Sequence, residues 1–405
     1  MPRAAPTAAL STFELVAMVA SLSALNALAI DIMLPALPEI GAAFHLANAN
    51  DRQLVVVVYV AVFGISQLAY GPLADAFGRR SVLITALGIY LFGSLLCVVA
   101  PSFELFLGAR ALQGVGAAAT RVVATAVVRD LTEGRRMAQI MSMAMTVFMI
   151  IPIVAPGIGQ LILFVAPWRW LFGALLIYGL IMMAWTLLRL PETLRPEHRR
   201  AFDASAIVSG FRESLRARQT LGYMAASTFF VGCLFGYITC CEQIFVDVFG
   251  LGAAFPLAFG ALAIAISVGT FVNSRIVMRY GMRRISHAAM IWFTGMLGLL
   301  ALLTALNGDH FWTFFAVMAA ALSMFGLIGS NLNTLAMEPV GHVAGSASAL
   351  FGAVTSTGGA VLGGLMARTF DGTTLPFTIA LFLTGLATIA ATLWTERGRL
   401  FVDAR

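Results

Sequence analysis

The sequence predicts an all-α polytopic membrane protein, with twelve transmembrane helices in two pseudo-symmetric six-helix bundles. Hydrophobic residues make up 60% of the 405 positions and charged residues only 11%, whereas soluble domains are typically about 25% charged. The apolar runs are long and unbroken, which excludes a membrane β-barrel, because barrel strands are about 10 residues of alternating polarity. A polar stretch near the middle of the chain divides the runs into two sets of six.

Each predicted helix is an apolar run close to the roughly 20 residues that cross a bilayer. Because twelve such runs fill the chain, no separate soluble domain is expected. The runs cover residues 13–37, 54–74, 82–100, 103–126, 139–163, 168–189, 220–245, 255–277, 286–306, 311–332, 343–367 and 374–394.

The polar stretch between the sixth and seventh runs predicts the domain organisation. We expect an N-terminal bundle over residues 1–190, a cytoplasmic linker over 191–219 and a C-terminal bundle over 220–405. Phe77-Gly78-Arg79-Arg80 after the second run is echoed by Tyr280-Gly281-Met282-Arg283-Arg284 after the eighth. Repeated halves with a binding site between them are typical of secondary transporters.

The basic residues predict the orientation of the chain. All 25 are arginines, and 20 of them fall on the side of the membrane that holds both termini. The opposite side has Arg52, Arg169 and Arg368. By the positive-inside rule both termini are cytoplasmic. The positive net charge therefore has a topological explanation, and we expect contact with membrane lipid and no nucleic-acid partner.

Asp31 lies inside the first apolar run, between Ile30 and Ile32. A carboxylate in hydrocarbon costs free energy, so an intramembrane acid is by default a candidate functional residue. We therefore expect Asp31 to have a partner and a role in proton coupling.

The turn between the second and third runs reads Gly71-Pro72-Leu73-Ala74-Asp75-Ala76-Phe77-Gly78-Arg79-Arg80. It resembles the cytoplasmic signature of the Major Facilitator Superfamily, Gly-x-Leu-Ala-Asp-x-x-Gly-Arg-(Arg/Lys). The resemblance implies the fold of that superfamily and a latch that closes the cytoplasmic side, with Asp130 as a partner of the arginines. The expected gate residues are Gly71, Asp75, Gly78, Arg79, Arg80, Arg129 and Asp130.

The fourth run contains Arg110-Ala111-Leu112-Gln113-Gly114-Val115-Gly116, which is similar to the superfamily motif Arg-x-x-Gln-Gly-x-Gly. An embedded arginine needs an acidic or polar partner. A rise of 1.5 Å per residue puts Arg110 roughly 12 Å and Asp31 roughly 10 Å from the same membrane face. We expect the two to meet as a proton-coupling pair; a static ion pair that holds the fold is the alternative.

The fifth run contains Pro152, Pro156 and Gly159, which resemble part of the superfamily's antiporter motif, Gly-x-x-x-Gly-Pro-x-x-Gly-Gly. A kink without any role in coupling is an equal expectation. With Asp31-Ile32-Met33-Leu34-Pro35 and the stretch from Ala336 to Ser348, these residues resemble the bicyclomycin-resistance (Bcr/CflA) branch of drug:proton antiporters.

Other embedded polar residues are possible substrate-lining groups. These are Gln113, Asn273, Asn331 and Asn333, and for the asparagines a hydrogen bond between helices is an equal alternative. Arg121 either acts in transport or extends its charge toward the cytoplasm. Glu242 is either a rim carboxylate or a second proton site.

Together with this resemblance, these residues imply a proton-coupled exporter of small, largely hydrophobic compounds that works by alternating access, and the resemblance implies a bacterial inner membrane. A facilitator or proton symporter for a metabolite is the first alternative, and a non-transporting receptor the second. We expect a monomer that is not an enzyme. We expect no cofactor or metal, because no nucleotide-binding loop or cluster of metal ligands is seen.

Overall fold

The computed structural model describes residues 11–194, 197, 199 and 204–401. This part of the chain is almost entirely helical and contains no strand. The first half contains α1 (Thr12–Asp31), η1 (Leu34–Ala36), α2 (Leu37–Ala43), η2 (Ala49–Gln53), α3 (Leu54–Phe77), α4 (Arg79–Val99), α5 (Phe103–Leu131), α6 (Gly134–Leu163) and α7 (Arg169–Arg189).

The second half begins with a short helix that the sequence analysis treated only as polar linker. It contains α8 (Ala204–Arg216), α9 (Arg218–Glu242), η4 (Gln243–Val248), η5 (Gly252–Ala254), α10 (Phe255–Tyr280), α11 (Met282–Asn307), α12 (Phe311–Leu322), α13 (Phe325–Met337), η6 (Glu338–Val343), α14 (Ala344–Arg368) and α15 (Leu375–Thr395).

Twelve crossings of the membrane are confirmed. The described residues contain eleven stretches that are long and apolar enough to span a bilayer. One of them, Phe311–Arg368, has 58 residues and non-helical backbone angles at Val340. At 1.5 Å per residue it measures about 87 Å, against a hydrocarbon core of about 30 Å. It therefore contains two crossings joined by η6.

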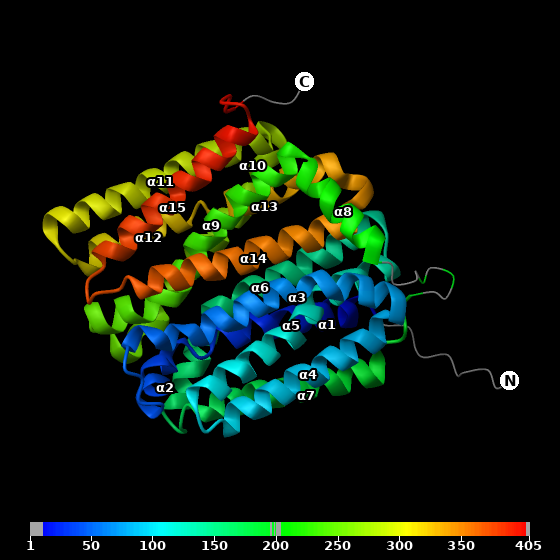
Figure 1. The fold of residues 1–405 in the computed structure, drawn as a ribbon, viewed down its shortest axis with the longest axis horizontal. Helices are drawn as coiled ribbons and strands as arrows, with labels where there is room; N and C mark the ends of the chain where they lie inside the picture. Colours follow the sequence, from blue (N-terminus) through cyan, green and yellow to red (C-terminus); the bar gives the residue numbers. More distant parts are fainter. Residues whose placement is uncertain (1–10, 195–196, 198, 200–203, 402–405) are drawn as a thin grey trace.

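The helices gather in two groups, which Figure 1 shows one above the other. The N-terminal helices α1 and α3 to α7 form one group, and the C-terminal helices α9 to α15 form the other. The groups meet along α3 with α14 and along α6 with α10. Small residues allow this contact: a Cβ on Gly64 of α3 would lie 2.7 Å from the backbone nitrogen of Thr357 in α14.

The molecule has two ends along the helix axes. The terminal end is the one where α1 begins and α15 ends, and the distal end carries α2, η2 and η4. Hydrogen bonds within each group fix the terminal end: Glu14 of α1 pairs with Arg189 of α7 at 2.7 Å. The two ends differ in the polar contacts that join the N-terminal helices to the C-terminal helices.

Candidate functional site

Asp31 is the last residue of α1, and Pro35 explains why the helix stops there. A proline has no N–H, and its ring clashes with the carbonyl four residues earlier, which here belongs to Asp31. The predicted first helix (13–37) is therefore broken, and the chain continues through η1. Asp31 is only 4% exposed, and its Oδ1 has no hydrogen-bond partner among the described residues.

The expected ion pair between Asp31 and Arg110 is not formed in the described chain, and this prediction is wrong for this structure. Arg110 is fully buried, and backbone and amide oxygens satisfy its guanidinium. Nε donates to the carbonyl of Val55 at 3.1 Å, Nη2 to the carbonyl of Ala29 at 2.9 Å and Nη1 to Oε1 of Gln113 at 2.5 Å.

The physical reason for the missing pair is direction around the helix. Arg110 reaches the level of Ala29, so the predicted depth was right. Residues two apart on an α-helix point about 200° away from each other, and Asp31 therefore faces away from the side on which Arg110 lies. Arg110 instead stacks over the ring of Tyr59, 4.3 Å from the ring centroid, and holds α1, α3 and α5 together.

The carboxyl group of Asp31 lies within electrostatic range of Tyr237 and Cys241, which are four residues apart on one face of α9. The hydroxyl of Tyr237 also lacks a hydrogen-bond partner in the described residues. A buried carboxyl and a buried hydroxyl without partners therefore lie where the two groups of helices meet.

Gly159, which belongs to the stretch that resembles the antiporter motif, packs closely against the end of the first span. A Cβ on Gly159 would lie only 1.9 Å from the carbonyl oxygen of Ile32, the residue that follows Asp31. Only glycine permits this approach of α6 to the break in the first span. Pro152 and Pro156 lie within α6, which continues through both of them. The motif thus packs directly against the Asp31 region.

The distal end is closed by polar contacts between the two groups of helices, which we call the distal seal. Arg52 of η2 pairs with Glu242 of α9 at 3.1 Å and with Asp247 of η4 at 2.6 Å. Asn50 donates to the carbonyl of Phe370 at 3.0 Å and accepts from Gln243 at 2.7 Å. The distal seal therefore consists of Asn50, Arg52, Glu242, Gln243 and Asp247.

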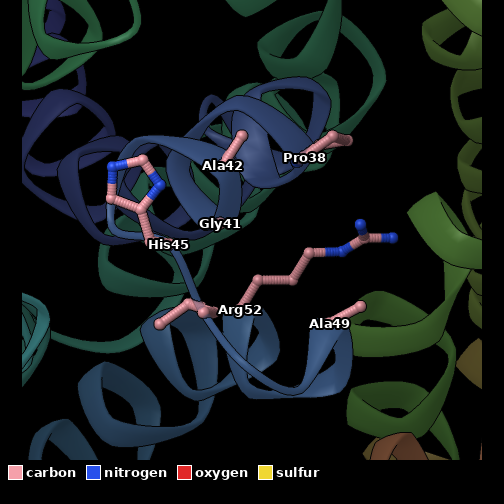
Figure 2. A pocket seen from close by; sticks show the side chains of 7 residues that line it. Pro38, Gly41, Ala42, His45, Ala49 and Arg52 are labelled. Atoms are coloured by element: carbon pink, nitrogen blue, oxygen red, sulfur yellow. The ribbon is translucent and has the colours of Figure 1, made fainter.

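Arg52 and His45 are among the residues that line a cavity of about 390 Å³. In Figure 2 the guanidinium of Arg52 extends away from His45. Glu242 is fully buried, so it is not the rim carboxylate considered from sequence. No sequence signal identified Arg52 as its partner, because 190 residues separate the two.

The signature between α3 and α4 forms a cluster that we call the terminal latch. Arg79 pairs with Asp130 at 2.9 Å and with Asp75 at 2.5 Å, so the expected partnership of Asp130 is confirmed. Glu192, which the sequence analysis did not single out, accepts from the backbone N–H groups of Arg79 at 2.9 Å and Arg80 at 3.2 Å.

Two glycines of the signature behave differently. Gly78 has φ of 93°, a conformation that favours glycine, and a Cβ there would lie 2.4 Å from Oε2 of Glu192. Gly71 has nothing within 4 Å of its Cβ position. Arg129, at the end of α5, is exposed. In the described residues, every ion pair of the terminal latch stays within the N-terminal half of the chain.

The possible substrate-lining residues divide into two kinds. Gln113 is fully buried and donates to Ser94 at 2.7 Å while it accepts from Arg110, so it lines no accessible surface here. Asn331 donates to Asn273 at 3.0 Å, which is the alternative of a hydrogen bond between helices. Asn333 is exposed.

Comparison with known proteins agrees with this architecture. The Major Facilitator Superfamily profile matches residues 19–364. "Bicyclomycin resistance protein homolog" of Haemophilus influenzae is 29% identical over 386 residues, which are 95% of this chain and 95% of that protein. "Multidrug resistance protein MdtL" of Shigella dysenteriae is 34% identical over 223 residues, 55% of each chain.

A solved structure shows the same fold. The xylose transporter XylE from E. coli, in a partially occluded inward open conformation, aligns with a TM-score of 0.73 at 13% identity, covering 95% of this chain and 99% of that one. From the sequence match over residues 19–364, the chain belongs to the Major Facilitator Superfamily.

Proposed function

We propose that this protein exports small, largely hydrophobic compounds from the bacterial cytoplasm in exchange for protons, by alternating access. Membership of a superfamily of transporters makes it a transport protein of the membrane and not an enzyme. Two relatives are named for resistance to drugs, which supports export of such compounds.

The proposed place is the bacterial inner membrane, with both termini in the cytoplasm. The multi-pass fold supports the first point, and the asymmetry of the arginines supports the second. The terminal end is then cytoplasmic and the distal end external. One chain supplies both groups of helices around the site, which supports a monomeric transporter embedded in lipid.

The observation that carries the proposal is the position of Asp31. It is buried without a cationic partner among the described residues, at the break that ends α1. A carboxyl group in such surroundings favours its neutral, protonated form. When the helices rearrange and water reaches it, the charged form becomes favourable. Asp31 therefore holds or releases a proton according to the side that is open.

The distal seal and the terminal latch provide the two gates. The distal seal is formed and the ion pairs of the latch stay within the N-terminal half, which supports a state that is closed toward the outside. We assign residues 1–190 and 220–405 as the two units that rock, joined by 191–219. In the opposite state the distal seal breaks, and the latch residues Gly71, Asp75, Gly78, Arg79, Arg80, Arg129 and Asp130 close the cytoplasmic side.

Exchange follows from this arrangement. In the state described, protonated Asp31 is ready to lose its proton to the cytoplasm when a compound enters from that side. After the change of state the compound leaves outward and Asp31 is protonated again. With a potential of about 100 mV, each net charge moved is worth about 2.3 kcal/mol, so one proton supports a useful concentration gradient.

The test measures proton release from purified, detergent-solubilised protein when apolar antibiotics and dyes are added near pH 7. We expect release from the wild type and none from Asp31→Asn. Glu104→Gln, which removes an exposed carboxyl group at the start of α5, serves as the matched control and retains the release. Binding of these compounds without release, unchanged in Asp31→Asn, would refute proton exchange and favour a facilitator.

A further inference from the structure

Arg121 of α5 is a charged group that the mechanism above does not use. It follows Arg110 by 11 residues, which is about three turns and about 16 Å along the helix. The two side chains therefore point in nearly the same direction, the one in which Arg110 is fully buried between helices. Yet Arg121 is exposed, so the inner face of α5 becomes accessible toward the cytoplasmic end.

The surroundings of this exposed side chain are unusual. Gly114 and Ala118, which lie on the same side of α5 nearer to Arg110, are buried, whereas Arg121 and Thr125, farther toward the cytoplasm, are exposed. Arg121 is therefore a cation on the side of α5 that is buried between helices around Arg110, about 15 Å from the cytoplasmic end of α5 at Leu131.

Arg121 has no counter-charge in the described residues: no ion pair and no hydrogen bond involves its side chain. Two acids lie well inside the apolar spans, Asp31 and Glu242. Asp31 is 19 residues, or about 28 Å, from the cytoplasmic start of α1, and Glu242 is still farther from the start of α9. Both lie more than about 10 Å from the level of Arg121 along the membrane normal.

Closure of the cytoplasmic side would enclose Arg121 completely. A guanidinium enclosed without a counter-charge carries a large desolvation penalty. Three acids at the cytoplasmic ends of the spans are held by arginines, Glu14 by Arg189, Asp130 by Arg79 and Glu338 by Arg283, and Glu133 lies exposed beyond the end of α5. Among the described residues, none of these acids lies at the level of Arg121, which leaves a charge from outside the chain to neutralise it.

From this geometry we propose that Arg121 binds an oxyanion of the transported compound, such as a carboxylate. The guanidinium offers a planar fork of donors that matches a carboxylate through two parallel hydrogen bonds. The preferred compounds are then amphipathic acids. The acid group sits on Arg121, and the apolar body extends toward the buried end of the passage near Asp31. This proposal deepens the proposed function and rests on it.

The test uses 1-pyrenebutyrate, an apolar ring system with one carboxylate, and its neutral amide. Binding of each to purified protein is followed through energy transfer from tryptophan to pyrene. A charge-assisted bidentate contact predicts that the wild type binds the acid about 10- to 100-fold more tightly than the amide. In Arg121→Gln the acid loses this advantage and the affinity for the amide is unchanged.

Two further variants make the result specific to the fork of donors. Arg121→Lys retains part of the preference, because it keeps the charge and loses the bidentate geometry. Arg212→Gln removes an exposed arginine of α8 on the same side of the membrane and leaves the preference intact.

Equal affinities of the wild type for acid and amide overturn the proposal, as does a preference for the acid that persists in Arg121→Gln. A parallel loss of affinity for both compounds in Arg121→Gln would assign the residue a structural role and overturns it too. Failure of the proposed function is recognised separately, since drug-evoked proton release depends on Asp31 and is measured without these probes.

Discussion

The distal seal makes a quantitative prediction about the balance between the two states of the transporter. Arg52 lies 3.1 Å from the carboxylate of Glu242, which is fully buried. At an effective dielectric constant of about 20, two charges at that distance attract each other by about 5 kcal/mol. Removing one partner of a buried pair typically costs about 3–5 kcal/mol, because the other charge stays buried and unpaired.

The second contact of Arg52 adds little to this figure. Asp247 is 2.6 Å away, but 42% of its side chain is exposed, and exposed ion pairs contribute about 0–1 kcal/mol. We therefore take about 3 kcal/mol as the loss in Arg52→Gln. The loss applies to the state in which the seal is formed. At 1.4 kcal/mol per factor of ten, this loss shifts the equilibrium between the two states toward the outward-open state by about 100-fold.

A native cysteine provides the assay. Cys241 is buried near the end of α9, within electrostatic range of Asp31. A membrane-impermeant maleimide added from outside reacts with it only when the distal side opens, so the labelling rate reports the open population. We expect the rate in Arg52→Gln to rise by up to about 100-fold over the wild type, until the outward-open state predominates.

Controls separate opening of the seal from loss of charge alone. Arg169→Gln removes another arginine of the distal end, which donates to the carbonyl of Ala100 within the N-terminal helices, and leaves the rate unchanged. Arg52→Lys gives a smaller rise, and Cys241→Ser abolishes the signal. A wild-type labelling rate in Arg52→Gln would refute the assignment of this ion pair as the external gate.

Two other substitutions test the packing around Asp31. Arg110→Met leaves the Gln113 side chain and two backbone carbonyls without their donor, at about 1–3 kcal/mol for each buried group. It should therefore lower the melting temperature while drug-evoked proton release persists, and the reverse pattern would show that Arg110 acts on the proton site. Gly159→Ala places a methyl group against the carbonyl of Ile32 and should reduce both stability, by about 1–3 kcal/mol, and transport. Gly157→Ala on the same helix meets nothing within 4 Å, so equal behaviour of the two variants would contradict the close-approach argument.

The spans were predictable because lipid leaves so few options for a backbone. Hydropathy located all twelve crossings, with ends that differ by a few residues where helices continue beyond the hydrocarbon. α8 was missed as a helix, although Ile207, Phe211 and Leu215 recur every four residues, a spacing typical of an amphipathic helix. The end of α1 at Asp31 also had its signal in the sequence, in Pro35.

The site was predictable in depth but not in direction. Counting residues from the membrane surface placed Asp31 and Arg110 in one layer, and Arg110 does reach Ala29. The direction in which each side chain points depends on how its helix is rotated about its own axis against its neighbours. Counting residues from the membrane surface gives depth and carries no information about this rotation. The Arg52–Glu242 pair was out of reach for a similar reason, since it joins residues 190 positions apart through tertiary packing alone.

The distal seal also has an electrical consequence. In the proposed mechanism, opening of the cytoplasmic side brings water and the cytoplasmic potential toward Asp31, and most of the membrane voltage then falls across the thin closed layer around Arg52 and Glu242. Because the voltage falls over so short a distance, a charge that moves only a few ångströms across this layer crosses most of the membrane potential. When the transporter changes state, the closed layer moves from the outer side of Asp31 to its cytoplasmic side, while Asp31 itself stays nearly in place. A proton bound to Asp31 therefore crosses the full membrane voltage, which is worth about 2.3 kcal/mol per 100 mV.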